Sequence, residues 1–222
     1  MSALKLKVSG VCLGLLFVPC PLLVAASVYA QSLDGEPLID FQHQWAHIKY
    51  QLPETGREAA YSRLYAQIKR ARIAHPDRAD LWTWEAIVLA NEAGARHSLA
   101  SIKMLGEAKE LLEKAIVIRP DAALAYAFLG DLYHNMPGWP VGFGSDRKAG
   151  HYLKKALNIA PNSLDGNYFM GMYLRDRKHF SEAIPYLQRA MHAPPRPGMS
   201  VADTGRKADA ARLLRHLRNM RH

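Results

Sequence analysis

The sequence predicts an all-α protein, a right-handed superhelix of stacked helix pairs with capping helices. The first observation is a pattern, Ala-x3-Leu-x2-Ala-x4-Pro, which occurs at residues 108–120, 149–161 and 183–195. Its apolar positions share one face of a helix, and the proline, which has no N–H to donate, ends that helix. The second observation is another apolar stripe about one helix earlier in each block. Such pairs of stripes, recurring at a fixed period, indicate stacked structural units.

Residues 1–30 have the organisation of a signal peptide. Lys5 and Lys7 precede an uncharged apolar run over residues 8–24. Small residues then flank a cleavage position after Ala30. We therefore expect an exported, periplasmic protein that is cleaved near Ala30.

The alternative is that this segment is kept as a membrane anchor, since residues 8–29 are long enough to cross a bilayer. Cleavage would remove Cys12 and Cys20, the two cysteines of the chain. The mature protein would then form no disulfide and would have no thiol for catalysis or metal binding. Its net charge would be about +7, because Lys5 and Lys7 are lost as well.

Residues 31–78 are predicted to form an N-terminal helical cap or a degenerate first unit. Two helices are expected, over 40–52 and 55–75, and Pro76 ends the second. The inward residues of these helices are predicted to be Trp45, Ile48, Leu64, Ile68 and Ile73.

Three helix pairs follow, over residues 79–122, 123–163 and 164–197. The last pair has 34 residues, whereas the first is 10 residues longer and the second 7 residues longer. Both insertions, at 90–107 and 134–148, fall between the two helices of their own pair. Stacked repeats place equivalent connections side by side, so the insertions should neighbour each other along one rim. The first helices carry apolar stripes that are consistent with these bounds: Trp82, Ala86 and Leu89; Tyr126, Leu129, Gly130 and Tyr133; Met170, Gly171 and Leu174.

These stripes resemble the signature of the tetratricopeptide-repeat (TPR) family, whose first helix carries a large residue, a leucine, a small residue and an aromatic at fixed offsets. The middle pair matches all the signature positions, whereas the other two depart from it at Glu85 and Asn167. The resemblance implies a TPR-type α–α solenoid over residues 79–197. The small residue (Ala86, Gly130 or Gly171) should lie where the two helices of a pair approach most closely.

Residues 198–222 predict a basic C-terminal capping helix over 201–220. Its apolar stripe is Ala210, Leu213, Leu214, Leu217 and Met220. Arginines and a lysine, Arg206, Lys207, Arg212, Arg215, Arg218 and Arg221, are expected on the opposite, solvated face. In an exported protein this face would suit an anionic membrane surface or an acidic partner better than nucleic acid.

The second insertion contains two prolines and three glycines and should be a shaped loop. Trp139 and Phe143 in it have two interpretations. They either pack the loop onto the solenoid or form an aromatic wall for a ligand or partner. The concave face of the solenoid is the second candidate surface, because first-helix residues there point away from the core. The candidate contact residues from both regions are Tyr133, His134, Trp139, Phe143, Tyr168, Met172 and Arg175.

No motif for catalysis or cofactor binding is present. Gly142-x-Gly144 follows a predicted helix and lacks a third glycine, so it is no phosphate-binding loop. His43 and His47 have the spacing of metal ligands on a helix, but no third ligand accompanies them. We therefore expect a protein that is not an enzyme and that carries no cofactor or metal.

Three segments resemble one narrower family, the periplasmic T-components of TPR-associated TRAP transporters. They are Ser98-Leu99-Ala100 followed by residues 108–116, the run Pro137–Gly144, and Pro194–Gly198. The resemblance implies a periplasmic protein partner such as a solute-binding protein, homo-oligomerisation and a pocket for a small apolar ligand. A lipid-attachment motif, found in the anchored members, is missing here.

The leading hypothesis is a non-catalytic periplasmic scaffold that binds a partner protein along the concave face and the aromatic loop. One alternative is a component that binds or passes on a small apolar ligand. A second alternative is an adaptor for assembly or maintenance of the cell envelope.

Overall fold

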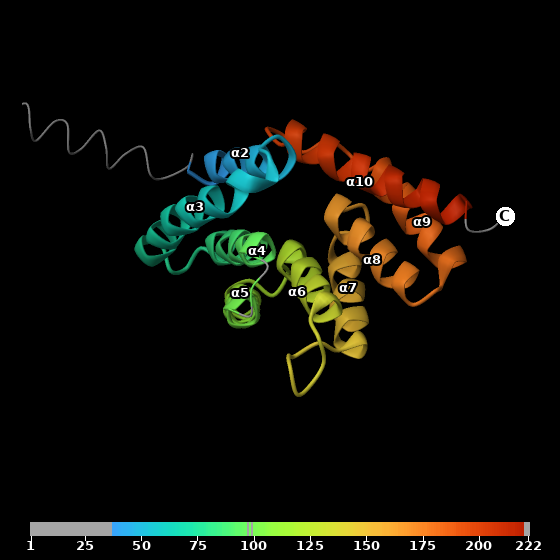
Figure 1. Ribbon diagram of the computed structural model, residues 1–222, viewed down its shortest axis with the longest axis horizontal. Helices are drawn as coiled ribbons and strands as arrows, with labels where there is room; N and C mark the ends of the chain where they lie inside the picture. The colour runs from blue at the N-terminus through green and yellow to red at the C-terminus, as the bar shows by residue number, and fades with distance from the viewer. Residues whose placement is uncertain (1–36, 97, 99, 220–222) are drawn as a thin grey trace, which may run out of the picture. The chain divides into compact units, whose positions relative to one another are not determined.

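The computed structural model describes residues 37–219 except 97 and 99. All regular secondary structure in this part of the chain is helical (Figure 1). The predicted signal peptide, both cysteines and Met220 lie outside the described residues. None of the described helices combines the length and the apolar character needed to span a bilayer.

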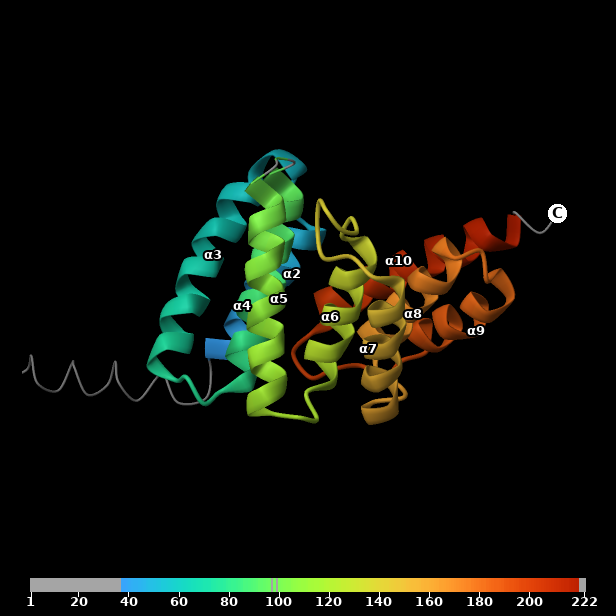
Figure 2. The same ribbon diagram turned by 90° about the horizontal axis from the view of Figure 1, so that it is seen from below.

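The helices form consecutive antiparallel pairs. Two helices, α2 (Pro37–Tyr50) and α3 (Glu54–Ala74), come first. The three repeat pairs are α4 (Ala79–Arg96) with α5 (Ala100–Ile118), α6 (Ala123–Asn135) with α7 (Asp146–Ile159), and α8 (Leu164–Asp176) with α9 (Phe180–Met191). The first helices α4, α6 and α8 pack on one another as an inner layer, and the second helices stand outside them (Figures 1 and 2). The described chain is thus an all-α solenoid of the TPR type.

The repeated small residues lie at the helix crossings, as the sequence predicts. A Cβ atom added to Gly130 would lie 2.7 Å from Leu153 Cγ and 3.1 Å from the Ala149 carbonyl oxygen. One added to Gly171 would lie 2.6 Å from Leu187 Cδ2. The paired leucines and alanines of the second helices are buried. A larger side chain at either glycine would clash with the facing leucine, which would have to move to relieve the overlap.

The first insertion takes a different form from the second. Within 90–107, α4 continues to Arg96 and α5 begins at Ala100, so most of this insertion is helical. Residues 136–145 instead form a loop between α6 and α7 that stands out from the helices (Figure 2). The two regions are neighbours, since Leu105 of the first and Met136 of the second line the same cavity.

The N-terminal pair agrees with the sequence prediction except at one residue. Trp45, Ile48, Leu64 and Ile68 are buried, but Ile73 is 61% exposed. Ile73 follows Ile68 by five positions, and at 3.6 residues per turn this places it on the far side of α3. Our inclusion of Ile73 among the inward residues was therefore wrong.

The last helix, α10 (Ser200–Asn219), begins beside α2 and runs away from it towards the C-terminus (Figure 1). It packs on α8 and α9, with Ala210, Leu213, Leu214 and Leu217 buried as predicted. At its start His43 Nε2 of α2 contacts the Gly198 carbonyl oxygen, and Gly205 lies directly under the Tyr50 ring. Residues of the inner helices α2, α4, α6, α8 and α10 line one shared cavity. α10 lies across part of the concave face, which the repeat pattern does not predict, and the rest of that face stays open to solvent.

Candidate functional site

The concave face holds a cavity of about 950 Å³ that is open to solvent on one side. Its lining comes from seven helices: α2, α3, α4, α5, α6, α8 and α10. The contact between α2 and the start of α10 brings the first and last of these helices together. Its polar residues include Lys49, Asn91, Asp131, Tyr168, Arg206 and Asp209, with Glu54 and Arg57 also present. Its apolar residues include Phe128, Leu132, Phe169 and Met172. The cavity therefore offers both charged groups and an apolar surface to a small molecule.

Lys49 projects from α2 into this cavity. Its Nζ atom donates a hydrogen bond of 3.2 Å to Asn91 Oδ1 and lies 5.8 Å from the centroid of the Trp45 ring. Burial lowers the pKa of Lys49 to about 8, and repulsion by Arg206 adds to this effect. No carboxylate of the described residues lies within ion-pair distance of Lys49. Its charge is therefore incompletely compensated.

Asp131 stands on α6 and faces the same cavity. It accepts a hydrogen bond of 2.8 Å from Asn135 Nδ2, one turn further along the helix. Burial raises the pKa of Asp131, and the attraction of Arg206 and Lys49 offsets this only in part. Within the described residues Asp131 has no ion-pair partner. It is thus the negative counterpart of Lys49 on a different wall.

Arg206, on α10, lines one wall of the cavity. It is 4% exposed, and its Nε donates a 2.9 Å hydrogen bond to Asp165 Oδ1. Its guanidinium lies 4.7 Å from the centroid of the Tyr168 ring, a cation–π arrangement. The sequence analysis placed Arg206 on the solvated face of the last helix, and this was wrong. Arg206 precedes Ala210 by four positions and so shares the buried stripe.

Asp165, on α8, binds both Arg196, which precedes α10, and Arg206 of α10. Its Oδ2 accepts a 2.8 Å hydrogen bond from Arg196, which also donates from Nε to Asp203 at 2.7 Å. Although burial acts to raise the pKa of Asp165, the nearby Arg206 and Arg196 hold it below its usual value. The network fixes the start of α10 to α8. The remaining arginines of α10, Arg212, Arg215 and Arg218, are not buried, as predicted.

A second, more apolar cavity of about 430 Å³ lies on the other side of Asp165. Trp84, Leu124, Ala127, Pro197 and Met199 are among the residues that line it. Asp165 borders this cavity while its partner Arg206 borders the larger one. The ion pair therefore stands between the two spaces.

The predicted contact residues separate into three groups. Tyr168 and Met172 line the large cavity. Tyr133 and Phe143 pack on each other edge to face, with ring centroids 5.3 Å apart. Trp139, at the tip of the loop, is 90% exposed. Of the two interpretations for the loop aromatics, Phe143 follows the packing one, whereas Trp139 points outward and remains a candidate contact.

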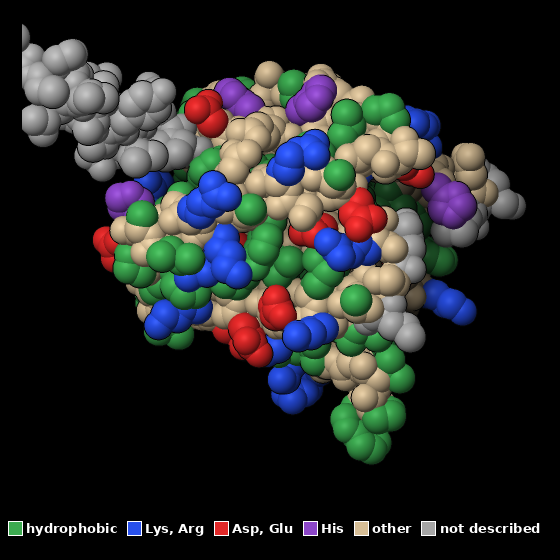
Figure 3. All heavy atoms as spheres, turned by 60° about the vertical axis from the view of Figure 1, so that its left-hand side comes forward, with side chains coloured by type: hydrophobic (Ala, Val, Ile, Leu, Met, Phe, Trp, Pro, Cys, Tyr) green, Lys and Arg blue, Asp and Glu red, His purple; other side chains and the backbone are tan. Residues whose placement is uncertain are grey.

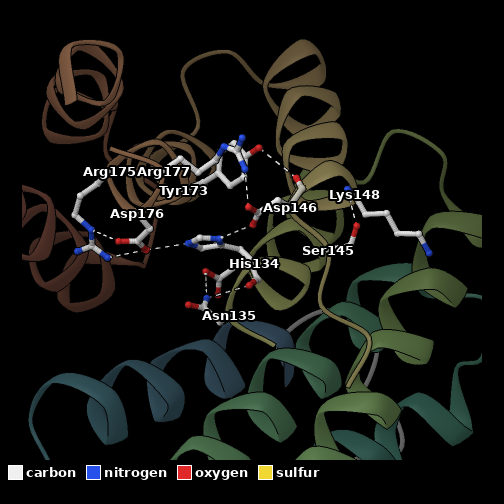
Figure 4. A network of polar contacts seen from close by, with 10 residues as sticks. His134, Asn135, Ser145, Asp146, Lys148, Tyr173, Arg175, Asp176 and Arg177 are labelled. Carbon is white, nitrogen blue, oxygen red and sulfur yellow. Dashed lines mark hydrogen bonds and ion pairs between the residues drawn. The ribbon is translucent and has the colours of Figure 1, made fainter. Parts of the chain in front are cut away.

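His134 and Arg175 belong to a polar network at the base of the loop (Figure 4). His134 Nε2 lies 2.9 Å from Asp176 Oδ2, and Asp176 also pairs with Arg175. Asp146, at the start of α7, pairs with Arg177 and lies 3.8 Å from His134 Nδ1. The network joins the end of α6, the start of α7 and the end of α8. It holds both ends of the loop against the next repeat.

Lys49, Arg206 and Asp209 were missed as site residues. Lys49 follows Trp45 by four positions and Arg206 precedes Ala210 by four, so each is a charged residue on an apolar helix face. That placement was a usable signal, because buried charges are rare unless they have a role. Their convergence could not be foreseen, since it requires knowing that α10 meets α2.

No protein-family model matches the sequence, and no curated protein matches it. Solved structures give matches at low identity. A TPR protein of Thermus thermophilus, TTC0263, shares 17% identity over 72% of this chain and 80% of its own, with a TM-score of 0.49. MamA of strain AMB-1 shares 19% identity over 79% and 94% of the two chains, with a TM-score of 0.45. PilF of Pseudomonas aeruginosa shares 14% over 81% and 91%, with a TM-score of 0.35.

Proposed function

We propose that this protein is a non-catalytic periplasmic scaffold that binds a partner protein through the tip of the loop between α6 and α7. The observation that carries the proposal is the exposure of that tip: Trp139 is 90% exposed and Val141 59%. Figure 3 shows the loop as a hydrophobic knob that projects from the surface. A solvent-exposed tryptophan next to a valine is costly in water, and tryptophan is the residue type most enriched among interface hot spots.

The loop holds this tip in one conformation. Gly144 N donates to the Pro137 carbonyl oxygen at 2.8 Å, and Ser145 N donates to the Tyr133 carbonyl oxygen at 2.9 Å. A Cβ atom at Gly144 would collide with the Met136 carbonyl, so the two ends of the loop touch backbone to backbone. Phe143 fastens the loop to Tyr133 beneath it. A preformed tip loses little conformational entropy on binding, and this favours affinity.

A solute-binding protein of a TRAP-type transporter is the partner that we propose. The support is the resemblance of residues 137–144, the loop itself, to the T-component family, together with the predicted export signal. An apolar knob of this size suits a matching hollow on a folded partner, because a buried aromatic anchor in a pocket is the usual centre of such interfaces.

Site-specific crosslinking tests the proposal. A photoreactive amino acid replaces Trp139 in the full-length chain, expressed in its native host. The expected result is one discrete crosslinked species in the periplasmic fraction, identified by mass spectrometry as a solute-binding protein. Val117 is the matched control, since it is 72% exposed on the outer helix α5 and lies outside the loop.

Three results would contradict the proposal in different ways. Equal crosslinking from Val117 and Trp139 would show that exposure alone captures neighbours. A product of twice the chain's own mass would assign the loop to self-association. Recovery of the chain in the cytoplasmic fraction would remove the periplasmic location.

A further inference from the structure

We propose that the large cavity is a binding site for a small zwitterion with an apolar body, an apolar amino acid or short peptide with free termini. The proposal goes beyond the partner-binding function and is independent of it. It rests on the charges and the apolar surface that the contact of α10 with α2 brings together.

Two opposite charges in the cavity lack ion-pair partners among the described residues. The Lys49 ammonium on α2 has one hydrogen bond, to Asn91, and the Asp131 carboxylate on α6 accepts one, from Asn135. They stand too far apart to form an ion pair with each other, since no nitrogen–oxygen distance of 4.0 Å or less joins them. Leaving two charges partly desolvated and uncompensated is unfavourable. A ligand with a carboxylate for Lys49 and an ammonium for Asp131 would compensate both.

The surrounding charges favour both ends of such a ligand. Arg206 repels Lys49, so a carboxylate placed near them relieves that repulsion. Asp209 also lines the cavity, and it adds negative potential for the ammonium. Asp209 is already paired with Arg212 and Arg206 with Asp165, so a simple anion would leave Asp131 uncompensated and a simple amine would leave Lys49 uncompensated. The lining is therefore matched to a molecule that carries both charges.

The apolar part of the cavity sets the character of the ligand body. Phe128 and Phe169 stack edge to face, with ring centroids 4.9 Å apart, and Met172 lies beside them in the lining. Methionine and phenylalanine surfaces adapt to side chains of varied shape. The volume of about 950 Å³ admits a dipeptide or tripeptide as well as one amino acid. The lining does not select between them, so the experiment compares both.

The test is calorimetric titration of the purified mature protein with leucine and with the dipeptide Leu-Leu. Three blocked analogues of each separate the charges: the N-acetyl form keeps the carboxylate, the amide keeps the ammonium, and the doubly blocked form keeps neither. We expect the zwitterion to bind at least about tenfold more tightly than any blocked form, because each charge-assisted contact contributes that much. The tighter of leucine and Leu-Leu identifies the size of the natural ligand.

Variants assign each end of the ligand to its residue. Lys49→Met should weaken the zwitterion by about tenfold or more and leave the binding of the amide unchanged. Asp131→Asn should do the same for the zwitterion and leave the N-acetyl form unchanged. Circular dichroism confirms that both variants are folded. Trp139→Ala should bind the zwitterion normally, which separates this site from partner binding at the loop.

Binding should also weaken as the pH rises through about 8, since Lys49 loses its proton there and its attraction for a carboxylate with it. The proposal is overturned if neither zwitterion binds the folded wild-type protein. It is equally overturned if the N-acetyl form or the amide binds as well as the zwitterion, or if both variants bind as the wild type does.

Discussion

The inner helices α6 and α8 have one closely packed apolar side and one side that carries charged residues. Towards their partner helices they present Gly130 and Gly171, which pack without a gap against Leu153 and Leu187. On their other side they present Asp131, which lines the large cavity, and Asp165, which pairs with Arg206 of α10. The first surface is repeated in every unit and maintains the fold. The second differs from unit to unit, as expected of a surface that serves recognition.

The largest change in stability should come from breaking the ion pair between Asp165 and Arg206. Asp165→Ala leaves Arg206 buried without its partner and Arg196 with one partner fewer, so we expect a loss of about 3–5 kcal/mol in the free energy of unfolding. Urea denaturation measures it. Asp146→Asn, which breaks an exposed pair with Arg177, is the control and should cost at most about 1 kcal/mol. Similar losses in both variants would mean that the buried network is not special.

The same aspartate should make the protein sensitive to acid. The pKa of Asp165 in the folded state is lowered, so the unfolded chain takes up this proton first as the pH falls. Its stabilising contribution is therefore complete above the unfolded pKa and is lost as the pH falls through the folded one. We expect stability measured from pH 5 to pH 2 to fall less steeply in Asp165→Asn than in the wild type. Parallel curves would remove Asp165 from the acid response.

A substitution at the helix crossing tests the packing side. Gly130→Val should destabilise the protein by about 1–3 kcal/mol or more, because the new side chain would overlap Leu153. Gly94 is the matched control, since nothing lies within 4 Å of a Cβ atom added there. Gly94→Ala should instead stabilise the helix by about 0.5–1 kcal/mol. Thermal unfolding of the two variants should therefore shift in opposite directions.

A smaller and opposite effect is expected on the cavity side. Lys49→Met should stabilise the ligand-free protein by on the order of 1 kcal/mol at pH 7, because it removes a charge that burial disfavours. In the wild type the folded state loses this proton near pH 8, whereas the unfolded chain keeps it to about pH 10.4. Stability should therefore rise with pH across this interval, and the rise should be absent in Lys49→Met. A destabilised Lys49→Met would mean that Lys49 is well compensated by its present neighbours.

The smallest change in stability is expected at Trp139, in the loop between α6 and α7. Trp139→Ala removes a side chain that is 90% exposed, so the free energy of unfolding should change by less than about 0.5 kcal/mol. Partner capture should be lost at the same time. A clear fall in stability would show that Trp139 packs on the solenoid in solution, and it would weaken the proposed role of the loop.

The packing side could be predicted from the sequence and the cavity side could not. Gly130, Gly171 and their partner leucines recur at fixed spacing, and helix pairing is a local property of the chain. The placement of Arg206 depended on where α10 lies, which no repeat pattern encodes. The prediction that Ile73 is buried was wrong for a simpler reason: it rested on the residue type and not on the position of Ile73 around α3. The loop was foreseen as shaped, but its glycines do not reveal that Phe143 turns in and Trp139 out.

The contact between His43 of α2 and Gly198, just before α10, also has a kinetic consequence. These residues are 155 positions apart in the chain. Each repeat pair instead joins two helices that follow one another directly in the sequence. Pairings of high contact order form late, because the intervening chain must be ordered before its ends can meet. We therefore expect the repeat hairpins to fold first and the junction of α2 with α10 to close last. In hydrogen exchange, the amides at this junction should open at a lower free energy than those of α6 and α8. That partial opening would widen the access of a ligand to the cavity without unfolding the repeats.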